Sequence, residues 1–91
     1  MAAQIPNDNT PFKPMLGLGS RGVVQCVHNG SNNASLYGSV NGTNYALIHE
    51  FTASEIKEVS LCPYLLIAAA KNGTITGNVD AGTTVFIDET R

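Results

Sequence analysis

From residue 22 onward the chain carries short runs of β-branched and aromatic residues, and several of these runs alternate between apolar and polar positions. Alternation with a period of two predicts β-strands, because successive side chains of a strand point to opposite faces of a sheet. The predicted strands cover residues 22–28, 34–40, 44–51, 64–71 and 83–88, and a weaker one, interrupted by Gly77, covers 74–79.

The alternation also assigns side chains to faces. In the segment 34–40, Ala34, Leu36 and Val40 are expected to share one face. In the segment 44–51, one face is expected to carry Tyr45, Leu47, His49 and Phe51. The segment 64–71 is apolar at almost every position, which predicts a central strand covered on both sides.

Asn-Gly dipeptides lie between the predicted strands, at Asn29-Gly30, Asn41-Gly42 and Asn72-Gly73. Both residue types tolerate the positive φ of a type I′ turn, so Asn-Gly between apolar runs is a strong hairpin signal. We therefore expect the chain to fold back on itself as an antiparallel all-β protein. We expect a tight hairpin at Asn41-Gly42, between the strands 34–40 and 44–51.

Residues 52–59 fit two local structures. Thr52 and Glu55 have the spacing of a capping box, which suits one helical turn. Ile56 and Val59 fit a short strand equally well. We favour a crossover between two sheets that includes a short strand. The fold is then an antiparallel β-sandwich of about six or seven short strands, with a jelly roll as one arrangement.

Residues 1–20 differ from the rest because they contain three of the four prolines. Proline cannot donate a ladder hydrogen bond, so we expect an extended arm beside a sandwich domain of residues 21–91 that folds without it. The apolar side chains of the arm are unusual for a disordered tail, so we expect the arm to pack on its own sandwich or on a neighbouring subunit. A loose terminus is the alternative. The candidate residues for contacts with a capsid or a neighbouring subunit are Ile5, Phe12, Met15, Leu16 and Leu18.

The composition of the chain argues against nucleic-acid and membrane partners and favours other proteins. The 91 residues suit one small domain, and only 13% of them are charged, which is about half the usual share. The net charge is −2 and the basic residues are scattered, so we expect no nucleic-acid partner. The longest apolar run is too short for a bilayer and no signal-peptide pattern is present, so we expect neither a membrane nor a secretory role. A weakly charged polar surface suits packing against other proteins.

The sequence contains no convergent set of catalytic or metal-ligating residues, so we expect no enzymatic activity, cofactor or metal. Glu50, Glu55 and Glu58 fit a solvated crossover better than a catalytic carboxylate pair. Cys26 and Cys62 lie on different predicted strands and lack C-x-x-C spacing. We expect two reduced, buried thiols; a disulfide between the sheets is the alternative in an oxidising compartment.

The segment 36–48, LYGSVNGTNYALI, resembles the Gly-Ser-x-Asp-Gly-Thr-Asn-aromatic hairpin of small β-sandwich proteins from tailed bacteriophages. Asn41 stands where that family usually has Asp, and Tyr45 where it usually has Trp. Both replacements keep a turn former and a large aromatic ring. Pro63-Tyr64 resembles the Pro-aromatic start of the family's central strand, and GTTVFI at 82–87 resembles its C-terminal Gly-Thr-Val strand.

This resemblance covers roughly residues 22–88 and implies a structural component of a virion. It implies a capsid decoration (cement) protein that binds the major capsid protein on the capsid surface, associates with itself as a homotrimer and is assembled in the host cytoplasm. One alternative is another virion component, such as a neck, tail or fibre protein. The other is a carbohydrate-binding sandwich, since a similar hairpin occurs in discoidin-like domains. A sugar site would need exposed aromatic rings, for which Tyr37 and Tyr45 are the candidates.

Overall fold

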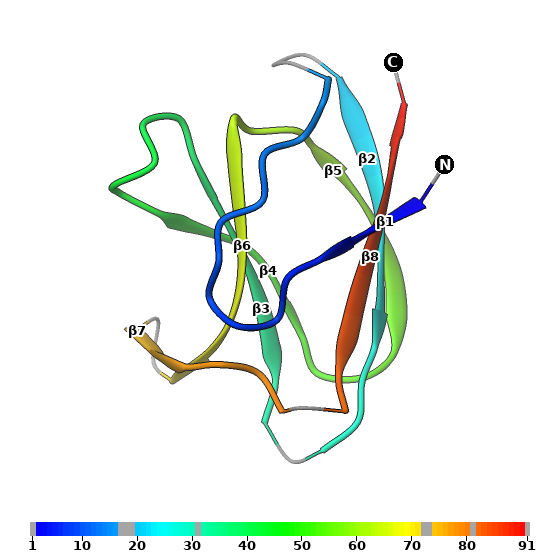
Figure 1. Ribbon diagram of the computed structural model, residues 1–91. Helices are drawn as coiled ribbons and strands as arrows, with labels where there is room; N and C mark the ends of the chain where they lie inside the picture. The colour runs from blue at the N-terminus through cyan, green and yellow to red at the C-terminus, as the bar shows by residue number, and fades with distance from the viewer. Residues whose placement is uncertain (1, 17–19, 31, 72–73, 81, 91) are drawn as a thin grey trace.

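The computed structural model describes residues 2–16, 20–30, 32–71, 74–80 and 82–90. Within these ranges the protein is all-β, with eight strands and no helix (Figure 1). The strands are β1 (Ala2–Ile5), β2 (Arg21–Val27), β3 (Ala34–Ser39), β4 (Ala46–Phe51), β5 (Glu55–Ser60), β6 (Tyr64–Lys71), β7 (Thr74–Gly77) and β8 (Thr84–Thr90). The antiparallel sandwich expected from the sequence is confirmed, with one or two strands more than predicted.

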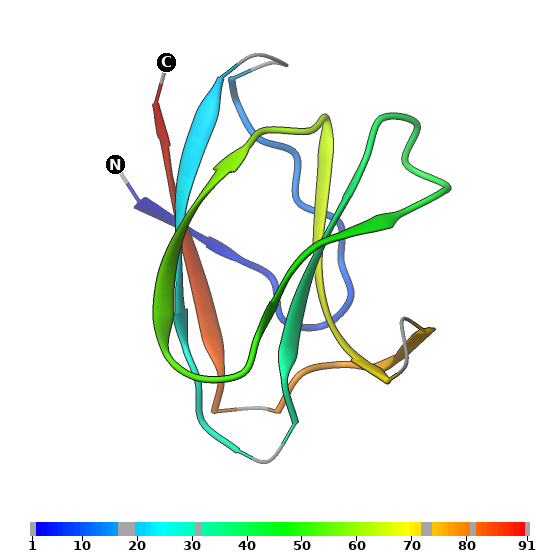
Figure 2. The same cartoon turned by 180° about the vertical axis from the view of Figure 1, so that it is seen from behind.

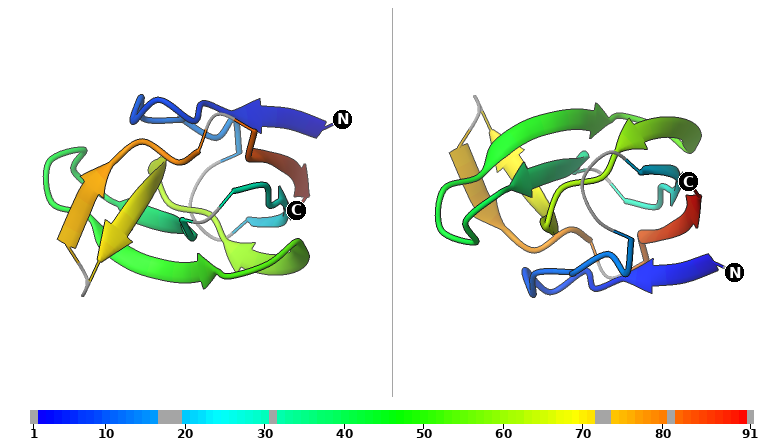
Figure 3. Two further views of the ribbon diagram at one scale, coloured as in Figure 1. Left: turned by 90° about the horizontal axis from the view of Figure 1, so that it is seen from below. Right: turned by 90° about the horizontal axis from the view of Figure 1, so that it is seen from above.

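Two four-stranded sheets pack face to face (Figures 1 and 2). Sheet A has the strand order β1-β8-β2-β5, and sheet B has the order β4-β3-β6-β7. All pairs within them are antiparallel. The chain passes from β4 of sheet B into β5 of sheet A along one side of the sandwich (Figure 3). The predicted crossover with a short strand is therefore confirmed, and the alternative helical turn does not form.

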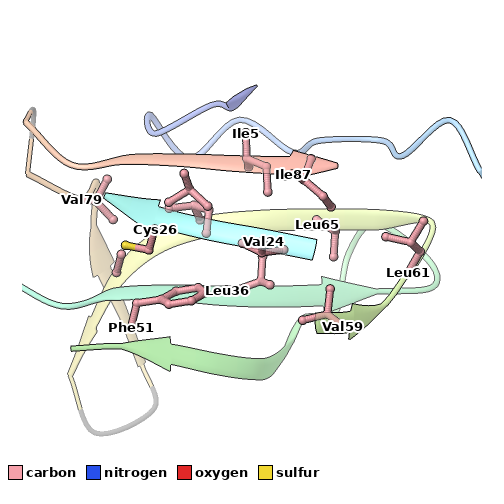
Figure 4. Close-up of a cluster of buried hydrophobic side chains, with 13 residues drawn as sticks. Ile5, Val24, Cys26, Leu36, Phe51, Val59, Leu61, Leu65, Val79 and Ile87 are labelled. Carbon is pink, nitrogen blue, oxygen red and sulfur yellow. The ribbon is translucent and has the colours of Figure 1, made fainter. Parts of the chain in front are cut away.

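The core lies between the two sheets and draws on strands of both (Figure 4). Burial alternates strictly along β2, where Val24 and Cys26 are fully buried while their neighbours face solvent. Leu36 and Phe51 of sheet B are also fully buried in this cluster. Burying each large apolar side chain contributes about 1.5–3 kcal/mol, so the alternating pattern read from the sequence directs the packing of the sheets.

The outer face of sheet B carries a second, smaller cluster. Tyr37, Leu66 and Ala68 are buried there, with Tyr45 and Ala70 packed against them. This cluster explains why β3 is buried at every position and why β6 is apolar on both faces. The prediction that the segment 64–71 is covered on two sides is confirmed for residues 65–69, which are all buried.

A β-bulge in β4 changes which side chains face the core. Leu36 pairs with His49, but the next residue of β3, Tyr37, pairs with Leu47, so Ile48 is the extra residue. Ile48 packs against the core, whereas Leu47 shares the outer face with Tyr37. The predicted strict alternation, which put Leu47 and His49 on one face, is wrong here because the bulge exchanges the faces.

The first residues of the expected arm form part of the sandwich. β1 pairs with β8 along its whole length and ends at Ile5, which is fully buried in the core. Farther along, Phe12 and Leu65 exchange two backbone hydrogen bonds, of 2.7 and 2.8 Å, that tie the segment to β6. The described part of residues 1–20 therefore packs on its own sandwich, where it supplies an edge strand to sheet A and a bridge to sheet B.

The Asn29-Gly30 turn does not form the predicted hairpin. The strand before it, β2, pairs with β5 and β8, and the strand after it, β3, pairs with β4 and β6. The turn therefore carries the chain from sheet A to sheet B. Gly30 has φ 124°, so glycine is required for its backbone conformation, as the sequence suggests, although the strands that it joins are not neighbours.

A polar clamp holds this connection to the segment that precedes β8. The buried Thr83 hydroxyl donates to the Asn29 carbonyl (2.8 Å) and accepts from the Asn29 N–H (3.0 Å). The Asp80 carboxylate accepts two hydrogen bonds from Asn32, one from the backbone N–H and one from the side-chain amide. These bonds give partners to backbone groups of the crossover that pair with no strand, and they satisfy the buried Thr83 hydroxyl.

Candidate interaction surfaces

The β3–β4 hairpin carries the motif that resembles phage sandwich proteins, and side chains organise its loop. The Ser39 hydroxyl accepts hydrogen bonds from the N–H groups of Asn41 and Gly42, at 3.2 and 2.9 Å. The Asn41 side-chain oxygen in turn accepts from the N–H groups of Thr43 and Asn44, both at 2.9 Å. The Ser-x-Asn-Gly-Thr-Asn pattern thus supplies the acceptors that replace ladder bonds in this loop.

The hairpin at Asn41-Gly42 is confirmed, but it is not tight. The loop between β3 and β4 consists of residues 40–45, whereas a tight hairpin has a loop of two residues. Gly42 has φ 76°, while Asn41 is not among the positive-φ residues of the described chain. A type I′ turn needs positive φ at both positions, so the loop belongs to another class.

Replacing Gly42 by valine should destabilise the protein by about 1–3 kcal/mol, because a β-branched side chain would be held at positive φ. An ideal Cβ at this position would also lie 3.1 Å from the Tyr64 ring. Thermal unfolding followed by circular dichroism measures the effect. An unchanged melting temperature would contradict the loop geometry, and Asn44→Val, at an exposed position of the same loop, is the control.

The hairpin exposes apolar side chains on both sides of its loop. Val40, the first residue after β3, is 71% exposed, and Leu47 is 52% exposed on β4. The loop projects away from the body of the sandwich (Figures 1 and 2). Exposed apolar side chains on a projecting loop are suited to contact another protein surface.

The structure separates the apolar residues of the expected arm. Ile5 is a core residue, and Phe12 and Leu16 are half-buried against the core. Met15 is 93% exposed, which leaves it free to contact a partner. Leu18 lies outside the described residues. The sequence pattern does not distinguish these positions, because all of them are apolar residues in a proline-rich segment.

Of the other two predicted turns, Asn29-Gly30 belongs to the clamped crossover described above. Asn72 and Gly73 lie outside the described residues, and the strands on either side, β6 and β7, pair with Lys71 opposite Thr74. The two described turns therefore belong to different connections, one between the sheets and one within sheet B.

The two tyrosines considered for sugar stacking are not exposed platforms. Tyr37 is buried in the outer cluster of sheet B, and Tyr45 is half-buried against it. Their hydroxyl oxygens are both buried and have no hydrogen-bond partner among the described residues. The motif tyrosine, Tyr45, therefore packs one side of its ring against the outer cluster of sheet B and contributes to holding the hairpin on the sheet.

The three glutamates of the predicted crossover region bind different partners. Glu55 lies 3.0 Å from His49 Nε2, Glu58 lies 2.9 Å from the Arg21 guanidinium, and Glu50 accepts a hydrogen bond from the Asn33 amide. Groups of three or more metal-binding side chains do not occur among the described residues. Among the described residues there is likewise no helix long and apolar enough to cross a membrane.

The two cysteines have different environments, and both are free thiols. Cys26 is buried in the core, and this burial, with a smaller effect of the Glu55 charge, raises the pKa of its thiol. Cys62 is only partly buried. Because the thiolate is the reactive form, Cys62 should react first in the folded protein.

We expect Cys62 to alkylate at least about tenfold faster than Cys26 under native conditions, since Cys26 must wait for the core to open. In denaturant without reductant, both thiols should be labelled, as measured by mass spectrometry. An unlabelled chain lighter by two hydrogens would instead demonstrate a disulfide. A Cys62→Ser variant serves as the control that assigns the fast reaction.

The exposed surface at Ile56 is not evident from the apolar pattern of the sequence. Ile56 fits an apolar position of a short strand, but this residue is 64% exposed on β5, at the outer edge of sheet A. The sequence feature that could have indicated this exposure is the pair of charged residues on either side of Ile56, in the segment Glu55–Ser60 (EIKEVS). Charged residues at such positions are unusual in a strand that packs on both faces.

The chain matches no protein-family model, no curated protein and no solved structure.

Proposed function

We propose that this protein is a structural component of a bacteriophage virion, and that it acts as a decoration protein bridging subunits of the major capsid protein. The observation that carries the proposal is the β3–β4 hairpin. Its sequence resembles that of phage sandwich proteins, and it presents the exposed apolar side chains of Val40 and Leu47, in a chain with only 13% charged residues. Its partner would be the capsid shell, and its location the capsid surface.

The mechanism is mechanical. Val40, Leu47 and Met15 each offer an exposed apolar side chain, and burying one fully contributes at most about 1.5–3 kcal/mol. A single contact of this size binds weakly. A protein that engages several capsid subunits at once gains avidity, by roughly 10²–10⁴ over one site. Stabilisation of the shell then follows from binding energy distributed across subunit boundaries.

The loop of residues 40–45 is well suited to this task because its shape is fixed before binding. Ser39 and Asn41 hold four backbone N–H groups of the loop, from Asn41 to Asn44. A loop that is already ordered loses little conformational entropy on binding. The exposed Val40 side chain is thereby presented at low entropic cost.

Sedimentation with capsid shells tests the proposal. The probe is a shell assembled from the major capsid protein encoded in the same genome. The purified chain should co-sediment with the shell and raise the temperature at which the shell dissociates. Val40→Asp should weaken binding by about tenfold or more, because it places a charge where an apolar contact is buried.

Ala53→Asp is the matched control, since Ala53 is exposed between β4 and β5 and the variant carries the same added charge. Equal loss of binding in both variants would show a general charge effect and contradict a contact through the hairpin. Failure of the parent chain to bind shells would refute the decoration role. Binding to isolated tails or necks instead would place the protein elsewhere in the virion.

A further inference from the structure

The edge of sheet A formed by β5 is open. In the described part of the chain, no strand lies beyond β5 in the order β1-β8-β2-β5. Ile56, Lys57, Glu58 and Ser60 are all exposed. Figure 3 shows β5 at the margin of the molecule, where the chain has just crossed from β4. An exposed edge strand is a template for pairing with another chain.

The phase of the ladder determines which backbone groups point outward. The Leu61 N–H donates to the Ser20 carbonyl (2.9 Å), one step beyond the pair Arg21↔Ser60. Hydrogen-bonded pairs alternate in an antiparallel ladder, so Val59 also directs its backbone groups toward β2. The intervening residues, Ile56 and Glu58, therefore direct their N–H and C=O groups toward the open edge.

We propose that β5 pairs antiparallel with β5 of a second copy of this chain, with Ile56 opposite Ile56 on a twofold axis. In this register the two Ile56 residues exchange both of their outward backbone bonds. Glu55 then lies opposite Lys57 of the second copy, and Lys57 opposite Glu55. These two Glu55–Lys57 pairs are non-hydrogen-bonded pairs of the ladder, in which the Cα atoms lie about 4.5 Å apart. The opposite charges are therefore direct neighbours.

The neighbouring registers bring like charges together. An axis at Lys57 would place the two lysines opposite each other, and an axis at Glu55 or Glu58 would do the same with glutamates. Like charges directly opposite each other in a sheet are destabilising. Side chains also stay on the same face across both copies only when the numbers of two paired residues differ by an even number. Among positions 55 to 58, only an axis at Ile56 meets this condition and also avoids opposing like charges.

The same arrangement joins apolar surface on the outer face of sheet A. Ile56 lies beside Gln25, and Gln25 beside Phe86, in one row across the sheet. Val23 and Val27 are partly exposed on the same face. Pairing the edges brings the two Ile56 side chains into contact and extends this row across both copies. Glu58, which already binds Arg21, meets the uncharged Ser54.

The interface is short, and we expect a weak dimer with Kd of about 10–500 μM. A twofold pair is self-complementary and closed, so association should stop at two copies. The virion resemblance implies three copies instead, and the measured mass distinguishes the two. The inference rests on the β5 edge alone and does not depend on the proposed capsid function. A lysine on an edge strand can also prevent pairing, and in that case the chain stays monomeric.

Charge exchange at β5 tests the pairing. Sedimentation equilibrium of the full chain should give a parent dimer of twice 9.6 kDa at high concentration. Lys57→Glu should weaken dimerisation by about 10- to 100-fold, because two symmetric attractions become repulsions. Glu55→Lys should do the same. The double variant Glu55→Lys/Lys57→Glu should recover to within about threefold of the parent, since opposite charges again face each other.

Lys13→Glu, which makes the same change of charge in the segment that bridges to β6, is the control and should leave the dimer intact. Ile56→Pro tests the backbone, because it removes the outward N–H that β2 does not use, and it should give a folded monomer. A parent that stays monomeric at about 1 mM would overturn the proposal. So would a trimer, or a double variant no better than the single ones.

Discussion

Removing residues 1–20 should unfold the sandwich. The deletion takes away β1 and its ladder with β8, the fully buried Ile5, and the two backbone bonds between Phe12 and Leu65. Truncating one buried isoleucine to alanine already costs about 2–5 kcal/mol, and a small domain is stable by only about 5–15 kcal/mol. Circular dichroism of the truncated chain should therefore lack a sheet spectrum and a cooperative transition.

Point variants within the same segment give a graded test. Ile5→Ala should reduce the free energy of unfolding by about 2–5 kcal/mol, measured by urea denaturation. Met15→Ala, at an exposed position, should change it by no more than about 0.5 kcal/mol. Equal effects of the two variants, or a truncated chain that melts like the parent, would show that residues 1–20 do not contribute to the core.

Replacing Gly30 by alanine should destabilise the protein by about 3–5 kcal/mol. Its φ of 124° is strained for any side chain, at about 1–3 kcal/mol. An ideal Cβ there would also overlap the Asp80 carboxylate, with Asp80 Cγ at 2.6 Å. Asp80 would have to move away from Asn32, from which it accepts two hydrogen bonds. Bonds to charged groups contribute about 1.5–3 kcal/mol each.

Gly77→Ala separates strain from overlap. Gly77 also has positive φ, 154°, but an ideal Cβ there meets no atom of the described residues within 4 Å. This variant should cost only the strain, about 1–2 kcal/mol. The difference between the two variants, obtained from their urea midpoints, then measures the clamp at Asp80. A difference near zero would mean that the carboxylate relaxes freely and that the clamp adds no stability.

The strands that the sequence predicted best are those whose side chains alternate between core and solvent. β2 is the clearest, since Val24 and Cys26 face inward and Val23 and Gln25 outward. β1 escaped prediction because Ala2–Ile5 contains one large apolar residue and runs into Pro6. A short edge strand is stabilised by the strand that it pairs with, here β8. Because β8 is distant in sequence, the residues of β1 alone do not indicate this pairing.

Turn chemistry was informative about backbone conformation but not about pairing. Gly30 and Gly42 both have positive φ, as Asn-Gly suggests. Only the second of them joins strands of one sheet, because the choice between a hairpin and a crossover depends on which faces the flanking strands bury. The bulge at Ile48 is likewise set by the packing of β3 against β4 and leaves no mark in the sequence pattern.

The candidate surfaces were only partly predictable for the same reason. Exposure decides whether an apolar residue can meet a partner, and exposure is a tertiary property. Ile5 and Met15 look equivalent in the sequence, yet one is in the core and the other almost fully exposed. The hairpin motif predicted a connection that the structure confirms between β3 and β4, whereas the open edge of β5 emerged only once the order of the strands was known.

The pairing of β1 with β8 has a consequence for the rate of folding. β1 and β8 are the two strands farthest apart in the described sequence, and they pair with Ala2 opposite Asp88. Ile5 therefore has no partner strand until this contact forms, and sheet A is complete only then. Contacts this distant in sequence must close a long loop of chain, which favours slow folding, in milliseconds to seconds.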